Sequence, residues 1–431
     1  MTIDRRSFVQ ASGAAAAALT FPRRVFSIGR PDADPIRIGV IGCGGRGTGA
    51  VRDALAASEN VSLTAIGDLF PDHLSSAREQ FAKLSTTDPV FASRYKVSSE
   101  QCFTGLDAFR QVLATDVELV ILATPPAFRA EHLAAAIAAG KHVFMEKPVA
   151  VDVAGALSVI ASGEAASSKG LAVVCGTQRR HDPRYIETIR RIHDGQIGDV
   201  VGGSVYWNQG GLWNFPRKPE WSDAEWQLRN WLYFTWLSGD HIVEQHVHNL
   251  DVANWVMGSV PVRAVGVGGR QARTAPEYGH IFDHFGIEFE YPGGVRIASM
   301  CRQQDGTASQ VGERFVGSTG RSNGYNRIEG KKSWAWSGAT NILPYVEEHR
   351  DLVASIRSGK PLNEARRIAE STLTAIMGRE AAYTGQVIEW QKLIATPFNI
   401  RPTLTTLGAL ETPPVPVPGQ TTLARGFTSG W

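Results

Sequence analysis

Cysteine is scarce in this sequence, and its four copies lie far apart, at Cys43, Cys102, Cys175 and Cys301. None of them belongs to a C-x-x-C pair or to a zinc-ligand spacing. We therefore expect neither a disulfide framework nor a cysteine metal cluster.

An excess of charge of one sign is also lacking. The chain has 44 Lys and Arg against 42 Asp and Glu, a net charge of +2, without a long run of either sign. This balance does not indicate nucleic acid or an anionic membrane surface as a partner. A chain of 431 residues can bury a sizeable core, in two domains or one large one with additions. A small molecule is the expected ligand.

An apolar run long enough to span a bilayer is missing as well, so we expect no integral membrane association. The N-terminus has paired Arg5 and Arg6, then Ser7, Phe8 and an alanine-rich, weakly apolar stretch. This pattern predicts a twin-arginine export signal, without a convincing A-x-A cleavage site. The protein is then periplasmic or otherwise exported. A basic tail on a cytoplasmic protein is the alternative.

Apolar runs that end at glycine or proline recur along the first part of the chain and predict buried parallel strands, with helices between them. The runs are residues 36–42, 61–68, 117–126, 141–148 and 170–178. Later residues instead predict long strands at 199–209 and 284–300, and amphipathic helices at 344–361 and 364–385. We expect an α/β Rossmann-type parallel sheet domain followed by an α+β domain with a large, mainly antiparallel sheet.

The segment GCGGRG places Gly42, Gly44 and Gly47 in a G-x-G-x-x-G pattern between a strand and a helix. Such glycines allow a tight turn, a pyrophosphate close to the backbone and close helix packing. Asp68 ends the next strand, 21 residues after Gly47, where a carboxylate can bind an adenosine ribose. We expect NAD rather than NADP, a preference that Arg46 in the loop weakens. A purely structural glycine turn or an S-adenosylmethionine site is the alternative.

The tripeptide Glu146-Lys147-Pro148 and the segment TQRRHDPRY follow at the ends of later strands. With GVIGCGGRG ahead of them, they resemble the glucose-fructose oxidoreductase, inositol dehydrogenase and rhizopine-catabolism (Gfo/Idh/MocA) family, over about residues 36 to 392. The resemblance implies an NAD(P)-dependent oxidoreductase that transfers a hydride from a secondary hydroxyl of a sugar or cyclitol.

The family's pattern assigns Lys147 to holding the substrate hydroxyl and stabilising its developing negative charge. An ammonium group near that oxygen favours the deprotonated form, more strongly when buried. Softer assignments are cofactor contacts from Thr124, Pro125 and Glu146, and substrate contacts from Arg180, His181 and Tyr185.

The segment SGDHIVEQHVHNLDVANW spaces His241, Glu244, His248 and Asp251 by 3, 4 and 3 residues, which puts them on one face of a helix. The family's acid, His and Asp fall on Glu244, His248 and Asp251. His248 is our general base, because imidazole titrates near neutrality. Glu244 and Asp251 would orient it or hold substrate hydroxyls, and His241 contacts substrate or is a core histidine.

Two features of this segment depart from the family: Glu244 replaces a usual Asp, and His246 stands where a small residue is frequent. Two histidines and two carboxylates on one face also permit a zinc site. Hydride transfer to NAD needs no metal, and no H-E-x-x-H spacing is present. We therefore expect no metal.

Six of the eleven tryptophans lie between Trp207 and Trp236, among amides, charged groups and Tyr206. Flat rings beside polar groups suit a carbohydrate, although such a segment is as often a core or a subunit interface. The resemblance implies a homo-oligomer formed through the second-domain sheet.

An exported dehydrogenase that released NADH would stall, because soluble NAD is not replenished outside the cytoplasm. We therefore expect tightly bound NAD, reoxidised by an acceptor or by return of the hydride to the same molecule. The second route is that of a redox-neutral NAD-dependent glycosidase, and needs a further base such as Tyr206 or His181. A non-catalytic sugar-binding protein is a third hypothesis, which Lys147 and His248 argue against.

The expected organisation has four parts. Residues 1–35 are the signal and linker, 36–178 the NAD-binding domain, 179–395 the substrate and oligomerisation domain, and 396–431 a proline-rich arm. The late helices of the third part are free to pack back on the first domain.

Overall fold

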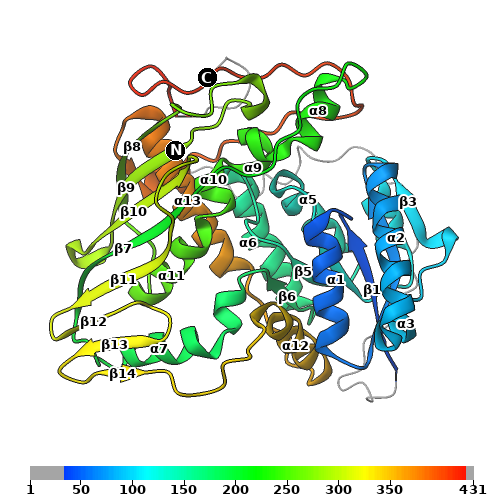
Figure 1. The fold of residues 1–431 in the computed structure, drawn as a ribbon, viewed down its shortest axis with the longest axis horizontal. Helices are drawn as coiled ribbons and strands as arrows, with labels where there is room; N and C mark the ends of the chain where they lie inside the picture. The colour runs from blue at the N-terminus through cyan, green and yellow to red at the C-terminus, as the bar shows by residue number, and fades with distance from the viewer. Residues whose placement is uncertain (1–33, 424–431) are drawn as a thin grey trace, which may run out of the picture.

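The computed structural model describes residues 34–423 (Figure 1). The twin-arginine segment lies outside these described residues. Two sheets organise the molecule, a six-stranded one near the N-terminal end and a nine-stranded one formed by the later chain. The predicted fold class is confirmed.

The first sheet is parallel throughout, in the order β3-β2-β1-β4-β5-β6. Its strands are β1 (Ile36–Ile41), β2 (Val61–Asp68), β3 (Cys102–Thr104), β4 (Leu119–Leu122), β5 (His142–Met145) and β6 (Val173–Cys175). The helices between them are α1 (Gly45–Ala57), α2 (Pro71–Thr87), α3 (Pro89–Arg94), α4 (Ala108–Ala114), α5 (Pro126–Ala138) and α6 (Val153–Ser168). Both faces of the central strands are buried, because helices cover both sides.

The carboxyl ends of these strands carry most of the residues that the sequence singled out. Gly42 follows β1, Asp68 ends β2, Thr124 follows β4, and Glu146 and Lys147 follow β5. In open parallel sheets, ligands bind at this edge where the strand order reverses, which here is between β1 and β4.

The second sheet runs β14-β13-β12-β11-β7-β10-β9-β8-β15, with β7 and β10 parallel and its other neighbours antiparallel. Its strands are β7 (Val200–Gln209), β8 (Arg263–Gly269), β9 (His284–Glu290), β10 (Arg296–Gln303), β11 (Gln310–Gly317), β12 (Gly320–Ser322), β13 (Arg327–Gly330), β14 (Trp334–Ala335) and β15 (Ile388–Glu389). A single strand over 284–300 is wrong: a turn at Gly293 and Gly294, both with positive φ, divides it into the hairpin β9–β10.

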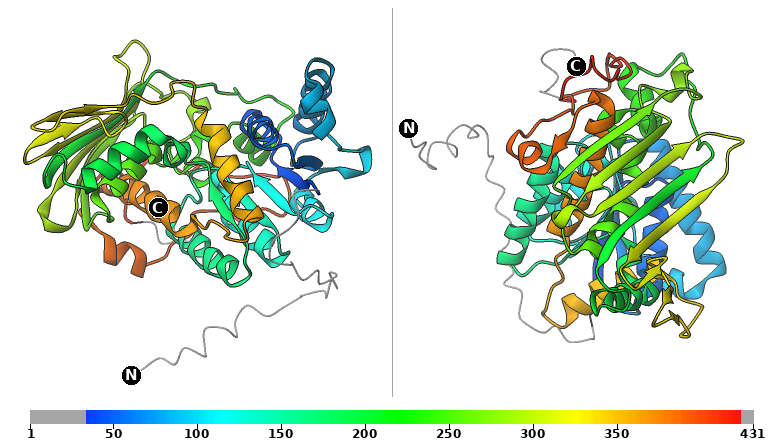
Figure 2. Two further views of the ribbon diagram at one scale, coloured as in Figure 1. Left: turned by 90° about the horizontal axis from the view of Figure 1, so that it is seen from below. Right: turned by 90° about the vertical axis from the view of Figure 1, so that its left-hand side faces the viewer.

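Helices cover one face of this sheet, and the other face is open (Figure 2). The later helices are α7 (Pro183–His193), α8 (Asp223–Arg229), α9 (Thr235–Ser238), α10 (His241–Glu244), α11 (Val247–Met257), α12 (Pro344–Arg357), α13 (Ala365–Thr384) and α14 (Trp390–Ala395). Short 3-10 turns span Ser99–Gln101, Gln178–His181, Trp231–Tyr233, Pro276–Tyr278 and Pro292–Gly294. α12 packs against α1, and α13 packs against α6 and β8, so the late helices join the two sheets.

Residues 396–423 contain no helix or strand and lie along the surface, in red in Figure 1. The Ile400 amide donates to the Asp152 carboxylate at the start of α6 (3.1 Å), and the Gly419 amide donates to the Thr384 carbonyl at the end of α13 (2.9 Å). This arm therefore spans both parts of the molecule. Of the helices in residues 34–423, none combines the length and apolar character needed to cross a membrane.

Candidate active site

The glycine loop after β1 has the shape that a dinucleotide needs. A Cβ on Gly42, whose φ is +97°, would lie 2.7 Å from the backbone of Thr124, and one on Gly47 would lie 1.8 Å from the Gly42 oxygen. Gly44, in contrast, has open space beside it and caps α1 without a side-chain hydrogen bond. The N-terminus of α1 is thus available to a pyrophosphate, and the residues fit NAD.

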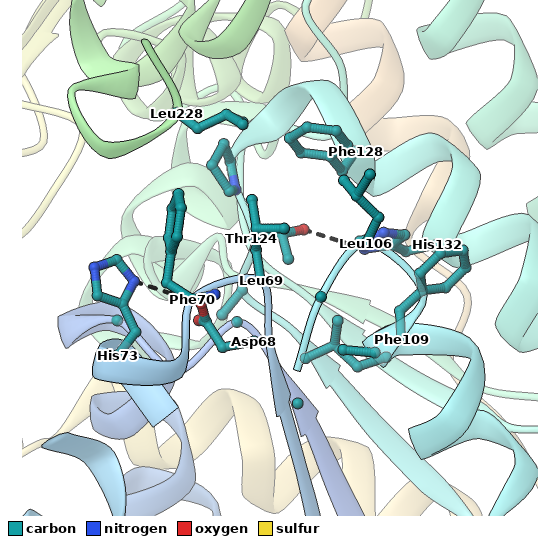
Figure 3. A pocket seen from close by; sticks show the side chains of 18 of the residues that line it. Asp68, Leu69, Phe70, His73, Leu106, Phe109, Thr124, Phe128, His132 and Leu228 are labelled. Atoms are coloured by element: carbon teal, nitrogen blue, oxygen red, sulfur yellow. Dashed lines mark hydrogen bonds and ion pairs between the residues drawn. The ribbon is translucent and has the colours of Figure 1, made fainter. Parts of the chain in front are cut away.

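Asp68 lies in a pocket beside this loop (Figure 3). Its carboxylate accepts hydrogen bonds from the amides of Cys43 (2.6 Å) and Phe70 (2.8 Å), and His73 Nδ1 lies 3.5 Å away. The pocket is lined by Gly42, Gly44, Asp68, Phe70, His73, Phe109, Thr124, Pro125, Phe128, His132, Leu228 and Trp231, with a few further apolar residues. A mainly apolar wall with one acidic group suits an adenosine.

Two buried basic residues that the sequence analysis missed fix the Thr124 turn. Arg129 donates to the Thr124 carbonyl (2.9 Å) and the Pro148 carbonyl (2.5 Å), which ties the end of β4 to the Glu146-Lys147-Pro148 segment. His132 Nδ1 lies 3.3 Å from the Thr124 hydroxyl, and its ring stacks on Phe109. Burial lowers the pKa of His132 to about 3, so this imidazole is neutral.

Lys147 points at the second part of the chain. Its Nζ donates to the backbone carbonyl of Glu244 (2.6 Å) and to the Glu244 carboxylate (3.0 Å). Both side chains are mostly buried. The structure therefore brings together a lysine and an acid that are 97 residues apart in the chain.

His248 lies four residues after Glu244, at the start of α11. Its ring stacks almost parallel to that of Trp207, with centroids 5.7 Å apart. Burial, and after it the charge of Lys147, lowers the pKa of His248 well below its ordinary value. Within the described residues, its imidazole makes no hydrogen bond to another side chain. The His248 imidazole is therefore uncharged at neutral pH.

Arg46 and Glu146 meet at the mouth of the glycine loop. Arg46 Nε donates to the Glu146 carboxylate (2.5 Å), and its guanidinium lies over the Tyr345 ring at 4.7 Å. Glu348 on α12 is fully buried nearby, where burial and the charge of Glu146 raise its pKa well above the ordinary value. This buried acid was not anticipated, because only tertiary packing brings α12 to α1.

The expectation of one continuous helical face is wrong. The chain forms α10 and α11 with a break at Gln245 and His246, where the His246 amide bonds to the His241 carbonyl, five residues back. His241 is buried against Phe285 and bonds to Asp240 (3.0 Å). His246 points to Ser299 on β10. His241 is a core histidine rather than a substrate contact.

Asp251 and Arg180 are also placed differently from the prediction. Arg180 binds the Asp251 carboxylate with two nitrogens (2.8 and 2.9 Å) and lies over the Trp255 ring, while Ser371 donates to the same carboxylate (2.8 Å). Asp251 is thus held by the neighbouring helices and not by His248. Arg180 lines a separate surface pocket with Trp255 and Ser371.

The remaining predicted substrate residues are spread over several environments. The two ring nitrogens of His181 face Asp351 (2.6 Å) and Glu364 (3.3 Å). Tyr206 bonds to Ser204 and, because residues alternate along β7, lies on the sheet face opposite Trp207. Tyr185 donates to the buried Glu313 (3.3 Å).

Comparison with known proteins adds the family. Residues 36–176 match the model GFO_IDH_MocA, described as an oxidoreductase family with an NAD-binding Rossmann fold. Residues 36–176 thus match the NAD-binding Rossmann domain of the Gfo/Idh/MocA oxidoreductase family.

Among curated relatives, inositol 2-dehydrogenase 3 of Saccharopolyspora erythraea is 27% identical over 61% of this chain and 65% of its own length. The 2,7-anhydro-N-acetylneuraminate hydratase of Escherichia coli is 26% identical over 50% of this chain and 53% of its own. The chain thus spans less than two thirds of the length of these relatives.

Solved structures share the fold. The aldose-aldose oxidoreductase of Caulobacter crescentus has a TM-score of 0.62 at 19% identity, over 82% of this chain and 99% of its own. GenD2 from gentamicin A biosynthesis, in complex with NAD, has a TM-score of 0.63 at 17% identity, over 85% of this chain and 99% of its own.

The structure also shows a functional candidate that the sequence did not single out. Arg179 rather than Arg180 lies beside the Lys147–His248 region, with its guanidinium 6.0 Å from the Trp207 ring centroid and bound to Glu313. Adjacent arginines on one turn point in different directions, so sequence alone gave no means to choose between them.

The tryptophan-rich segment divides between core and site. Trp226 and Trp236 are buried, with their indole nitrogens bonded to the Phe215 carbonyl and to Gln227. Trp207 lies against His248, and Trp231 lines the pocket beside Asp68. In residues 34–423 no group of three or more His, Cys, Asp and Glu side chains is arranged to hold a metal ion.

Proposed function

We propose that the protein is an NAD-dependent oxidoreductase acting on a secondary hydroxyl of a sugar or cyclitol. The observation that carries this is the pairing of Lys147 with Glu244, followed by the neutral His248. Lys147 would hold the hydroxyl oxygen and favour its deprotonation, and His248 would take the proton. Bound NAD would supply the hydride acceptor.

The residues that would hold NAD are those at the carboxyl edge of the first sheet. The glycine loop and the start of α1 face the pyrophosphate, and Asp68 faces the adenosine ribose, where its charge disfavours a 2′-phosphate. We propose that the cofactor stays bound between turnovers, because an exported enzyme has no pool from which to replace it.

The Trp207 ring beside His248 supports a carbohydrate-like substrate, because a flat indole packs well on the C–H face of a sugar or cyclitol ring. The name of the Saccharopolyspora relative, an inositol dehydrogenase, points the same way.

A redox-neutral glycosidase is the second candidate. Its cycle contains a hydration step, and the Escherichia coli relative is named a hydratase. The two additional bases suggested by the sequence are poorly placed, because His181 is bound between two carboxylates and Tyr206 is on the opposite sheet face. This route therefore needs a different base. A non-catalytic sugar-binding protein has less support, since binding alone does not require the Lys147–His248 pair.

Export and assembly are further parts of the proposal. Twin-arginine export rests on Arg5, Arg6 and the alanine-rich segment. Oligomerisation through the second sheet is supported by exposed apolar side chains on its open face, which include Val265, Val267 and Met300. Cell fractionation with and without an Arg5→Lys/Arg6→Lys change tests the first, and light scattering of wild type against Val267→Arg tests the second.

The function is tested with the purified protein and no added cofactor. It is incubated with nitrophenyl hexosides and, separately, with free sugars and inositols, while nitrophenolate and reduced nicotinamide are recorded. At most one equivalent of reduced nicotinamide, with no aglycone released, supports the oxidoreductase. Sustained nitrophenolate without net reduction supports the glycosidase. If neither nitrophenolate nor reduced nicotinamide is formed, even after NAD is added, both candidate functions are contradicted.

A further inference from the structure

The pocket beside Asp68 is closed by residues that belong to the second part of the chain. Leu228 and Trp231, from α8 and the turn after it, line this pocket together with Asp68, Phe70 and Thr124 of the Rossmann part. Figure 3 shows Leu228 across the pocket from Asp68. We call residues 221–236, which carry these two side chains, the strap.

Arg229 fastens the strap to the Rossmann part. Its guanidinium donates to both oxygens of Asp72 in the first turn of α2 (2.9 and 3.0 Å) and lies 3.9 Å from the centroid of the Phe70 ring. Its Nε donates to Glu225 within the strap (2.9 Å). Paired, planar contacts of this kind fix an arginine in both position and orientation.

Asp72 and Phe70, which Arg229 contacts, lie just after Asp68, the acid proposed to bind the adenosine ribose. The Phe70 amide is itself bonded to Asp68. Arg229 therefore binds residues of the same short segment, 68–72, that would contact the adenosine. Opening this side of the pocket requires the Asp72 pair and the Phe70 contact to break together.

The strap is supported from behind by the C-terminal arm. Gln227 is fully buried, donates to the Leu410 carbonyl (2.9 Å) and accepts from the Trp236 indole (2.7 Å). The Ala224 amide donates to the Gly408 carbonyl (3.1 Å). The strap is thus anchored at both faces, and its position does not depend on Arg229 alone.

We infer that Leu228, Arg229 and Trp231 complete the adenosine half of the nucleotide site and retain the dinucleotide between turnovers. This rests on the proposed function only in taking the ligand to be NAD. A Rossmann domain alone leaves an adenosine accessible at the sheet edge, whereas here release requires the strap to separate from α2. The strap would therefore slow the dissociation of the cofactor and keep it bound to the protein.

The test measures release of NADH from the full-length protein. NADH-loaded protein is mixed with excess NAD, and the loss of nicotinamide fluorescence gives the dissociation rate. We expect Arg229→Ala to raise this rate at least tenfold and to lower the nucleotide that survives gel filtration. The control Arg217→Ala, which removes another arginine near the strap, paired with Asp223, should leave both unchanged.

Asp72→Asn gives a second variant, whose change lies outside the strap and weakens the same ion pair from the side of α2. Asp72 is largely exposed, so its replacement should not affect folding. Faster release in both variants supports the inference. Wild-type release rates in Asp72→Asn and in a folded Arg229→Ala would overturn it. A wild-type protein that binds no NADH contradicts the proposed function instead, which separates the two failures.

Discussion

Glu244 and Asp251 are both acids near His248 in the same short segment, but they have different surroundings. The Glu244 carboxylate is paired with one flexible cation, Lys147, whose ammonium group also donates to the Glu244 backbone carbonyl. Asp251 is fully buried and receives three side-chain hydrogen bonds from Arg180 and Ser371. The first arrangement leaves an ammonium group able to turn to a substrate, and the second locks helices together. We therefore propose that Glu244 serves the chemistry by positioning Lys147, and that Asp251 serves to hold the helices together.

The largest expected effect comes from neutralising each acid in turn. Asp251→Asn leaves Arg180 buried without its counter-charge, which should cost roughly 3 to 5 kcal/mol of unfolding free energy. Glu244→Gln should leave the unfolding free energy within about 1 kcal/mol of wild type and lower kcat by about 100-fold, since it acts on the positioning of Lys147. Urea unfolding and steady-state kinetics on both variants check this. If the two variants lost equal stability, or equal kcat, the proposed difference between Glu244 and Asp251 would be contradicted.

A smaller effect separates the two histidines considered for acid-base chemistry. Burial opposes the charge on His181, but Asp351 and Glu364 outweigh it and raise its pKa to about 9, so His181 is a cation at neutral pH, unlike His248. Because the folded pKa exceeds the unfolded value, its stabilisation is complete below about pH 6.5 and is lost as the pH rises through the folded pKa.

We therefore expect the stability difference between wild type and His181→Asn to shrink by roughly 3 kcal/mol as the pH rises through that range. His349→Asn is the control, because burial lowers the pKa of His349 to about 3 and it is neutral throughout. Urea unfolding at several pH values measures both. A pH-independent difference for His181→Asn would show that its ion pairs do not contribute to stability.

The sequence predicted well what short segments determine. The glycine loop, Asp68 at the end of β2 and the alternation of strands and helices are local features, and the structure has them at the expected positions. The roles predicted for Glu244 and His248 stay predictions. The expectation that His241, Glu244, His248 and Asp251 share one helical face was wrong, because a break between α10 and α11 changes which side chains share a face.

What the sequence could not predict depends on contacts between distant segments. Arg229 meets Asp72 across 157 residues, and Arg179 meets Glu313 across 134. Glu348 is buried near Arg46 and Glu146 only because α12 packs beside α1. Neither propensity nor spacing carries information about such pairs.

In our proposal, Lys147 acts on the substrate hydroxyl and is not merely a structural lysine. Lys147→Met is the direct test, with NADH binding measured by fluorescence and turnover measured on the best substrate of the panel. We predict NADH binding within a few-fold of wild type and a loss of turnover of about 100-fold or more, since a charge that stabilises the developing oxyanion is removed.

Lys141→Met is the control, because that part-buried lysine donates only to the carbonyls of Thr115 and Val117, away from Glu244. It should keep most of its turnover. A Lys147→Met protein that still binds sugar and NADH and turns over within about tenfold of wild type would contradict the account.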